Sequence, residues 1–317
     1  LLLALNFPKT GKKNLGFADL DVSLKPPTAI GFVVDAGVVK GGGILSIDPE
    51  NHQYYGAGEL TIKLEAFNIS LKVIAIILTQ MPDGSKGYSF LLMASLEFEP
   101  GIDTVFGFKF KGIGVIVAIH RSMNLDEFQK AIRDDRIDLI LFPDNPVGNA
   151  PTIVRAMNSL FPAMQGRYVF AIMARIGWGT GKIVDLKLGL LVEVPSPVKI
   201  AIAGVMKVEV AKNGKSIVKL QVNFLIALDL GKKIFSVDAA IYDSKFVVFD
   251  IRGEVYVRYR WGDDPAFLYS VGGWHPNFEI PAGLNLPEKP QRVIVPIIES
   301  EYTKLILSCY LAFTSNT

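Results

Sequence analysis

The sequence predicts a mainly β protein built from long antiparallel amphipathic strands, with a small two-helix insert. Hydrophobic and polar residues alternate with a period of two over many stretches, which is typical of strands with two different faces. Short turns rich in Gly, Pro, Asn and Asp separate these stretches, and short turns join antiparallel neighbours. Half of the 317 residues are hydrophobic and only 20% are charged, so the chain can bury a large core.

The clearest alternation lies in the second half of the chain. Between residues 184 and 193, apolar side chains occupy the even positions, whereas Asp185, Lys187 and Glu193 occupy odd ones. We expect the apolar face of such a strand to be buried and the polar face to meet solvent. The strands then form either one extended, twisted sheet or two sheets packed face to face.

A helical insert interrupts the strands near the middle of the chain. Asn124 is a suitable N-cap residue, and Glu127 follows it three residues later, as in a capping box. A second helix is predicted over about 152–160, because apolar residues recur there at helical spacing. The insert therefore consists of two short amphipathic helices.

The strands and the insert divide the chain into three segments, 1–121, 122–162 and 163–317, which we expect to form one continuous domain. The first residues, "LLLALNFPKTGKK", are apolar, but they lack a basic leader and a small-residue cleavage site. No signal peptide is thus visible and no compartment is indicated. Because this start is typical of the middle of a strand, we expect the chain to be a fragment of a longer protein.

Composition argues against several classes of protein. Lys and Arg number 33 against 31 Asp and Glu, so the net charge of +2 gives no bias toward a nucleic-acid partner. The longest apolar run, 73–78, is far shorter than the roughly 20 residues of a transmembrane helix. The three histidines lie far apart, and the single cysteine, Cys309, is interpreted as a buried, inert thiol. No metal site and no cofactor is predicted.

The segment "GWGTGK" (177–182) is the nearest approach to a phosphate-binding motif. A Walker loop needs a further Gly five positions before the Gly-Lys pair, a Ser or Thr after the Lys, and a helix behind it. Ile176 and Ile183 occupy the first and last of these positions, and an alternating strand follows. We therefore interpret the segment as a turn between two strands.

The densest mixture of aromatic and polar side chains lies at 259–283. Its candidate ligand-binding residues are Trp261, Asp263, Asp264, Trp274 and His275. Aromatic rings beside carboxylates suit a sugar, so a glycan-acting or glycan-binding protein is one alternative. In the simpler interpretation, Trp261 is mostly buried at the end of an apolar stripe, whereas Asp263, Asp264 and His275 lie in exposed turns. No catalytic residue is proposed, because no Gly-x-Ser-x-Gly motif singles out a nucleophile.

Several stretches together resemble a known family. They include "GGGILSIDPENHQYYGAGEL", "LFPDNPVGNAPTIVRAMNSLFP", "RWGDDPAFLYSVGGWHPNFEIPAG" and the terminal "LAFTSNT". The resemblance is to large, mainly bacterial, β-rich proteins catalogued only as a domain of unknown function. It spans the chain from about residue 40 to the end. It implies that further β-rich sequence follows the "TSNT" segment, and it supplies no catalytic residues.

The leading functional expectation is a non-enzymatic structural or binding module of a larger bacterial protein or assembly. Its partners would be the remaining parts of its own chain or another protein. The alternative is a carrier of an apolar ligand such as a lipid, in which the sheet curls and its hydrophobic face becomes a groove. A mean hydropathy of +0.34 without a spanning helix motivates this alternative.

Overall fold

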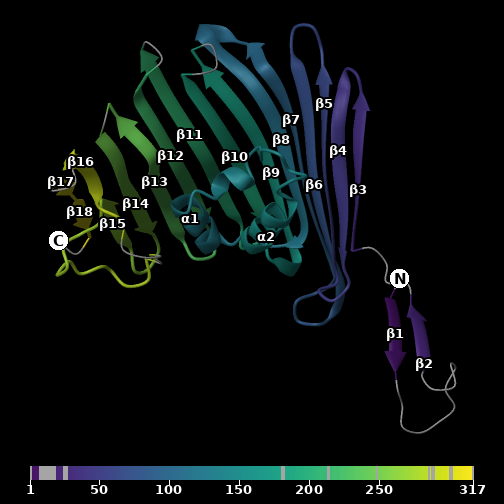
Figure 1. Cartoon of the computed structure of the whole chain (residues 1–317). Coiled ribbons are helices and arrows are strands. Elements are labelled where there is room, and N and C mark those ends of the chain that lie inside the picture. The colour runs from purple at the N-terminus through teal and green to yellow at the C-terminus, as the bar shows by residue number, and fades with distance from the viewer. Residues whose placement is uncertain are drawn as a thin grey trace.

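The computed structural model describes residues 2–6, 19–23, 28–179, 183–212, 215–247, 249–284, 286, 290–299 and 303–315. Its main body is one open, twisted sheet of 16 antiparallel strands, and two α-helices lie over one of its faces (Figure 1). The predicted mainly β class is confirmed. Of the two arrangements expected, the extended sheet is the one observed.

The elements follow one another along the chain with short connections. The strands before the insert are β1 (Leu2–Asn6), β2 (Asp19–Ser23), β3 (Ala29–Ala36), β4 (Val39–Asp48), β5 (Gln53–Lys63), β6 (Asn68–Gln80), β7 (Lys86–Asp103) and β8 (Phe108–Arg121), with a 3-10 turn, η1 (Val105–Gly107), before β8. The insert contains α1 (Leu125–Arg133), a 3-10 turn η2 (Ile137–Leu139) and α2 (Ala150–Leu160). The later strands are β9 (Ala163–Trp178), β10 (Val184–Val194), β11 (Lys199–Lys212), β12 (Lys215–Asp229), β13 (Ile234–Phe246), β14 (Phe249–Arg260), β15 (Ala266–Val271), β16 (Val293–Glu299), β17 (Lys304–Cys309) and β18 (Leu311–Thr314).

The sheet is a meander, in which each strand from β3 to β14 pairs with the next one along the chain. The pairing holds even across the insert, because β8 and β9 are direct neighbours. After β14 the sheet divides, since both β15 and β16 pair with β14. Strands β1 and β2 form a separate two-stranded sheet. Loops of a few residues are enough for every connection between β3 and β14 except the insert.

The "GWGTGK" segment joins two adjacent antiparallel strands. Trp178 at the end of β9 pairs with Val184 at the start of β10, as the turn interpretation requires. Residues 180–182 of the motif lie outside the described part of the chain.

The predicted helices are present. The Asn124 side chain accepts a hydrogen bond of 3.3 Å from the backbone N–H of Glu127, so Asn124 is the N-cap of α1. The second helix begins at Ala150, two residues before the predicted start, with Pro151 in its first turn. Proline fits there because the first helical N–H groups have no partner within the helix.

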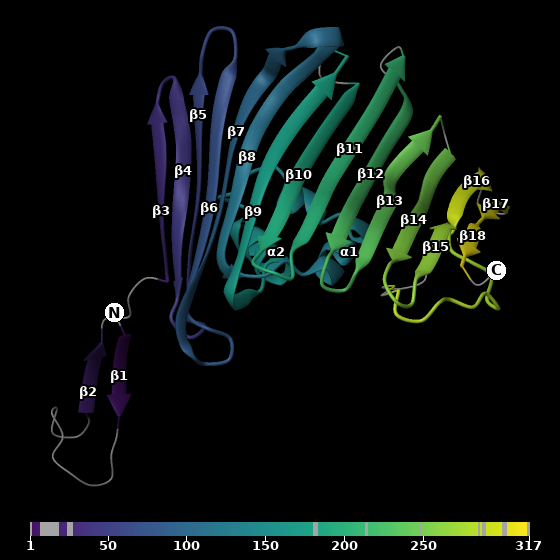
Figure 2. The same cartoon turned by 180° about the vertical axis from the view of Figure 1, so that it is seen from behind.

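The main hydrophobic core lies between the insert and one face of the sheet. Phe128 and Phe161 of the insert pack edge to face, with ring centroids 5.5 Å apart. They belong to one cluster with sheet residues such as Met93, Ile116 and Leu191. We call the sheet face under the insert, which carries these three residues, the covered face. The opposite side is the open face, which Figure 2 shows with the helices behind the strands.

The prediction for Cys309 was wrong. Cys309 lies at the end of β17 and is exposed rather than buried. Strand β17 lies at the outer edge of the sheet and pairs with β16, so the apolar residues around this thiol are exposed as well.

Candidate functional site

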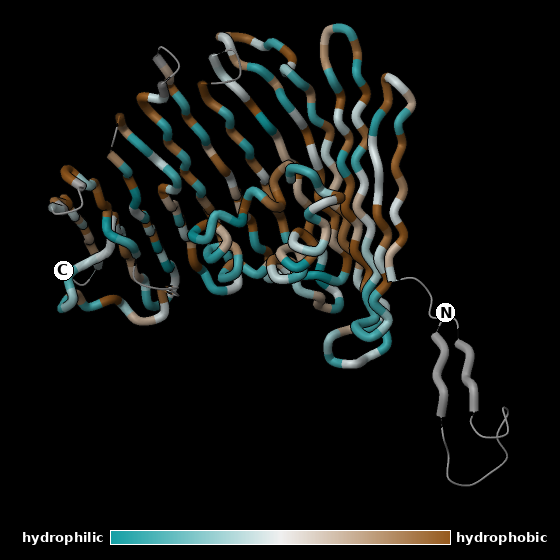
Figure 3. Tube along the Cα trace, viewed as in Figure 1, coloured by the Kyte–Doolittle hydropathy of each residue, from teal (hydrophilic) through white to brown (hydrophobic). Residues whose placement is uncertain are grey.

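The open face of the sheet is apolar over nearly its whole extent. The strand register places the same kind of residue on this face from strand to strand, and the tube in Figure 3 shows the resulting alternation along each strand. In the central strands β8 to β11 the face includes Ile113, Val115, Phe170, Ile172, Leu188, Leu190, Ile200 and Ile202. Among the paired positions of β4 to β14 whose side chains the structure describes, the open face carries no Asp, Glu, Lys or Arg.

These apolar side chains are exposed even in the middle of the sheet. Ile113 is 50% exposed, Phe170 48% and Ile172 63%. The twelve strands from β3 to β14, at about 4.8 Å spacing, and alternate residues about 6.8 Å apart make this face roughly 50 Å by 30 Å. The largest apolar patch on a typical monomer covers about 300–600 Å², so an area on the order of 1,500 Å² is far beyond the usual.

The expected assignment of the two faces was therefore wrong. On β10 the apolar residue Leu190 is 39% exposed, whereas Lys187 is 5% exposed and Glu193 is fully buried. The alternation itself is as predicted, but the polar side of the strand is the one that packs beneath the insert. This reversal is possible because the insert and the neighbouring strands supply a partner for each buried charge.

Glu193 shows how the covered face satisfies its charges. Its carboxylate accepts hydrogen bonds from the Ser122 hydroxyl (2.9 Å), the Met123 N–H (2.7 Å), Arg167 (2.7 Å) and Lys199 (3.1 Å). Burial opposes ionisation, but the Met123 N–H, Arg167 and Lys199 outweigh burial and hold the pKa of Glu193 below its usual value. The residue thereby fixes the start of the insert to the sheet.

Two further charged clusters lie on the covered face. Asp138 of η2 accepts hydrogen bonds from Lys187 (2.7 Å) and Lys207 (2.8 Å). Asp185 binds Arg175 and Lys111, and these two cations overcome the effect of burial and lower its pKa to about 2. Each carboxylate is thus engaged by two cations, which leaves it as a structural anion.

The ends of both helices are also held by polar side chains of the sheet. Asn223 donates to the carbonyl of Ile132 (3.2 Å) at the end of α1, and Arg121 donates to the carbonyl of Phe161 (2.8 Å) after α2. Arg121 is fully buried, and burial lowers its pKa to about 10. These contacts satisfy carbonyl groups that a helix leaves unpaired at its C-terminus.

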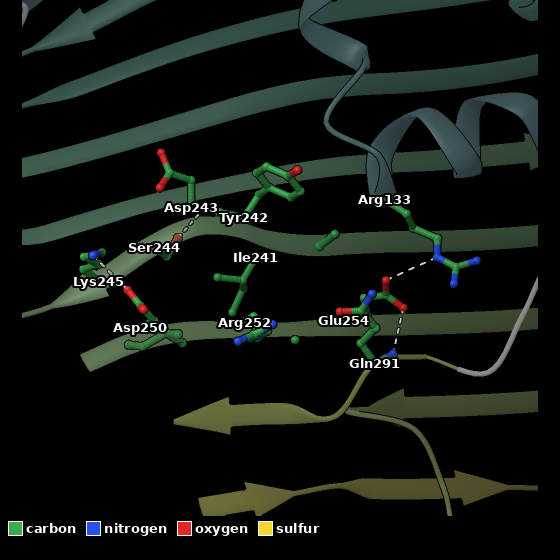
Figure 4. A pocket seen from close by; sticks show the side chains of 13 residues that line it. Arg133, Ile241, Tyr242, Asp243, Ser244, Lys245, Asp250, Arg252, Glu254 and Gln291 are labelled. Carbon is green, nitrogen blue, oxygen red and sulfur yellow. Dashed lines mark hydrogen bonds and ion pairs between the residues drawn. The ribbon is translucent and has the colours of Figure 1, made fainter. Parts of the chain in front are cut away.

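A cavity of about 470 Å³ lies beside an irregularity in β13 and extends to Glu254 of β14 (Figure 4). The Glu254 carboxylate accepts hydrogen bonds from Arg133 (3.2 Å), the Tyr256 hydroxyl (3.2 Å) and the Gln291 N–H (2.9 Å). Burial and the nearby Glu254 carboxylate raise the pKa of Tyr256. The Glu254 carboxylate is therefore held by three donors, and the raised pKa of Tyr256 keeps its hydroxyl protonated as one of them.

The five residues singled out at 259–283 do not converge on one site. Trp261 stacks on Tyr259 of the open face, with ring centroids 6.4 Å apart, and is half-buried rather than mostly buried. Trp274 is buried with Leu268 and Phe278, and Leu268 belongs to the opposite face of β15 from Tyr269, the neighbour of Val257 on the open face. The two tryptophans thus belong to different faces.

The polar members of this set are exposed, as predicted. Asp263 lies in the turn before β15, and Asp264 pairs with Arg260 (2.5 Å). The Nδ1 of His275 accepts a hydrogen bond from the N–H of Asn277 (3.1 Å). Asp264 and His275 are thus engaged by residues of their own turns rather than with each other.

The open face is the candidate functional surface that inspection of single motifs did not identify. Its signal was present in the alternating strands, because their polar positions hold Lys, Arg, Asp and Glu in numbers that allow mutual pairing. The alternation alone does not indicate which face of the sheet the insert covers.

Among the described residues, no group of three or more His, Cys, Asp or Glu side chains could hold a metal ion. No helix in the same residues has the length and apolar character needed to cross a membrane.

Comparison with known proteins gives one match. The model of a family described as "Family of unknown function (DUF6603)" matches residues 3–317. Neither the curated proteins nor the solved structures contain a significant match.

Proposed function

The chain belongs to the family of unknown function DUF6603, which assigns it no activity, and we propose from its open face that it carries lipid. The observation that supports this proposal is the exposed apolar surface across β4 to β14, on which no described side chain is charged. In this proposal, acyl chains lie along the strands and take the place of the protein layer that would otherwise cover such a sheet.

The dimensions of the face suit acyl chains. Its extent along the strands is about 30 Å, which is close to the thickness of the hydrocarbon core of a bilayer. Two acyl chains end to end span that thickness. Transfer of their apolar surface from water onto the face is favourable by about 25 cal/mol per Å².

The low relief of the open face also favours flexible acyl chains. The Phe32 ring lies across Gly43, where an added Cβ would be 2.6 Å from the ring, and the Phe224 ring lies in the same way across Gly204. Rings that lie flat on neighbouring glycines leave few projections. A surface whose described hydrogen-bonding side chains are few, such as tyrosine hydroxyls and the Trp178 indole, discriminates little among acyl chains of different length.

Organic extraction of the purified chain, followed by mass spectrometry, tests the carrier role. We expect lipid in at least stoichiometric amount. A clean extract from a folded chain would sink the proposal and favour a structural module, in which a second β layer packs on the face at about 10 Å.

A matched pair of variants locates the lipid. Ile172→Asp places a charge at the centre of the open face, and we expect it to lose most of the bound lipid without unfolding, because Ile172 is already 63% exposed. Val33→Asp makes a similar change at an 87% exposed position of β3 that lies on the other side of the sheet, opposite Gly42 of the covered face. Equal lipid content in the two variants would show that the open face is not the binding surface.

A further inference from the structure

One end of the sheet carries exposed apolar side chains at the tips of its turns. This end, which we call the upper rim, holds the turns β3–β4, β5–β6, β7–β8 and β13–β14 and the end of β9, at the top of Figure 1. Its exposed apolar residues are Val38, Leu64, Phe67, Val105, Phe106, Trp178, Phe246 and Val247. Every one of these turns thus presents at least one large apolar side chain to solvent.

The opposite end of the sheet is different. Its turns contain "DPENH" (48–52), "PDGS" (82–85) and "GDDP" (262–265), which are exposed polar or small residues typical of solvated turns. Leu230 is the large apolar residue exposed in the turn between β12 and β13. These hairpin turns at the two ends of the sheet therefore differ in chemistry.

Two residues of the upper rim have a backbone conformation that is unfavourable for their side chains. Phe106 and Val247 both have φ of 58°, in the left-handed region that Gly and Asn tolerate and that bulky or β-branched residues disfavour. Phe106 is nevertheless 88% exposed and Val247 51%. Neither side chain compensates for its strained backbone by burial within the chain, so a role outside the chain is a physical reason for its presence.

Charges near the upper rim neutralise one another. The ion pairs Lys40–Asp35 (3.0 Å), Lys109–Asp103 (2.5 Å) and Lys245–Asp250 (3.2 Å) lie beside these turns, and Lys219 pairs with Asp243. At these four pairs the apolar tips thus lie beside charges that are neutralised within the chain. A surface of this kind suits a partner that is apolar beneath a neutral polar layer.

We propose that the upper rim docks on a zwitterionic lipid bilayer, with Val105, Phe106 and Val247 inserted at the boundary between headgroups and acyl chains. Aromatic and aliphatic side chains at turn tips are stable at that depth. The strands of the open face run from this rim, so an acyl chain leaving the bilayer would continue directly onto it. Docking stands on the rim itself, whereas this path rests on the proposed carrier function.

Flotation of the chain with phosphatidylcholine vesicles tests the docking. The double variant Phe106→Asn, Val247→Asn removes two apolar tips and supplies a residue that tolerates positive φ, so its free energy of unfolding should not fall. We expect its binding to the vesicles to be weaker by about tenfold or more, because each tip loses the free energy of burying an apolar side chain. Leu230→Asn, at the opposite end, should bind like the unaltered chain.

Several results would overturn the proposal. Equal flotation of the double variant and the unaltered chain would do so, as would binding only to vesicles that also contain phosphatidylserine. An unaltered chain that yields extracted lipid but does not float overturns docking alone. A chain that floats through the rim but yields no lipid overturns the carrier function alone.

Discussion

At the scale of single residues, the burial of Glu193 decides how firmly the insert is attached. Its carboxylate has four hydrogen-bond donors and no exposure. Glu193→Gln keeps the size of the side chain but removes the charge that balances Arg167 and Lys199. We expect a loss of about 3–5 kcal/mol in the free energy of unfolding, measured by urea denaturation, as when one partner of a buried ion pair is removed.

Glu209 provides the control for this measurement. It lies on the neighbouring strand β11 and is exposed, so Glu209→Gln should change the free energy of unfolding by less than about 0.5 kcal/mol. A similar loss of unfolding free energy in the two variants would mean that Arg167 and Lys199 do not need the Glu193 carboxylate to balance their charges.

The partial exposure of Trp261 lowers the loss of unfolding free energy that we expect from its truncation. Its ring stacks on Tyr259 of the open face and is only half-buried. We therefore expect Trp261→Ala to cost about 1 kcal/mol, in the range of an aromatic pair. Phe128→Ala, in the core beneath the insert, should cost about 3–5 kcal/mol in the same urea denaturation. A larger loss for Trp261→Ala than for Phe128→Ala would place Trp261 in a covered core.

At the scale of elements, the insert is held to the sheet largely by carboxylates, so acid should weaken its attachment. The folded-state pKa values of Asp138, Asp185 and Glu193 lie below their usual values, that of Asp185 at about 2, because their cations and donors outweigh burial. Stability from such groups is present above the unfolded pKa, about 4, and is lost as the pH falls toward the folded pKa. Asp238 has the opposite sign, since burial raises its pKa.

We expect the free energy of unfolding to fall steeply between about pH 4 and pH 2 in chemical denaturation at a series of pH values. Asp185→Asn should be less stable at neutral pH and should show a shallower fall. Stability that rises over the same interval would mean that buried carboxylates with raised pKa values, such as Asp238, outweigh these three.

Most elements could be predicted from the sequence, but their faces could not. The period-two pattern indicated the strands, and Asn124 with Glu127 located the start of α1. The pattern at 184–193 is the same whichever face is covered, because burial of Lys187 and Glu193 depends on Asp138, Ser122 and Arg167, which are distant in sequence. These contacts, and not the alternation, determine which face of the sheet is open.

At the scale of the whole molecule, an open apolar sheet should be stabilised by anything that covers it. A ligand that binds only the folded chain adds RT ln(1 + [L]/Kd), or about 2.7 kcal/mol at one hundred times its Kd. We therefore expect lysophosphatidylcholine, below its micellar concentration, to raise the midpoint of thermal unfolding. Ile172→Asp should reduce this rise, and Val33→Asp should not. A midpoint unaffected by the lipid would show that the open face does not bind it.

Because the sheet from β3 to β14 is a meander, gain or loss of a hairpin changes its width. Each strand pairs with its neighbour in sequence, so duplication of one hairpin would widen the sheet by about 10 Å without changing any other pairing. Loss of the β3–β4 hairpin would narrow it by the same step, since that hairpin contacts the rest of the sheet through β5. Chains of this kind can therefore differ in the width of the sheet by whole hairpins, while the insert keeps its place between β8 and β9.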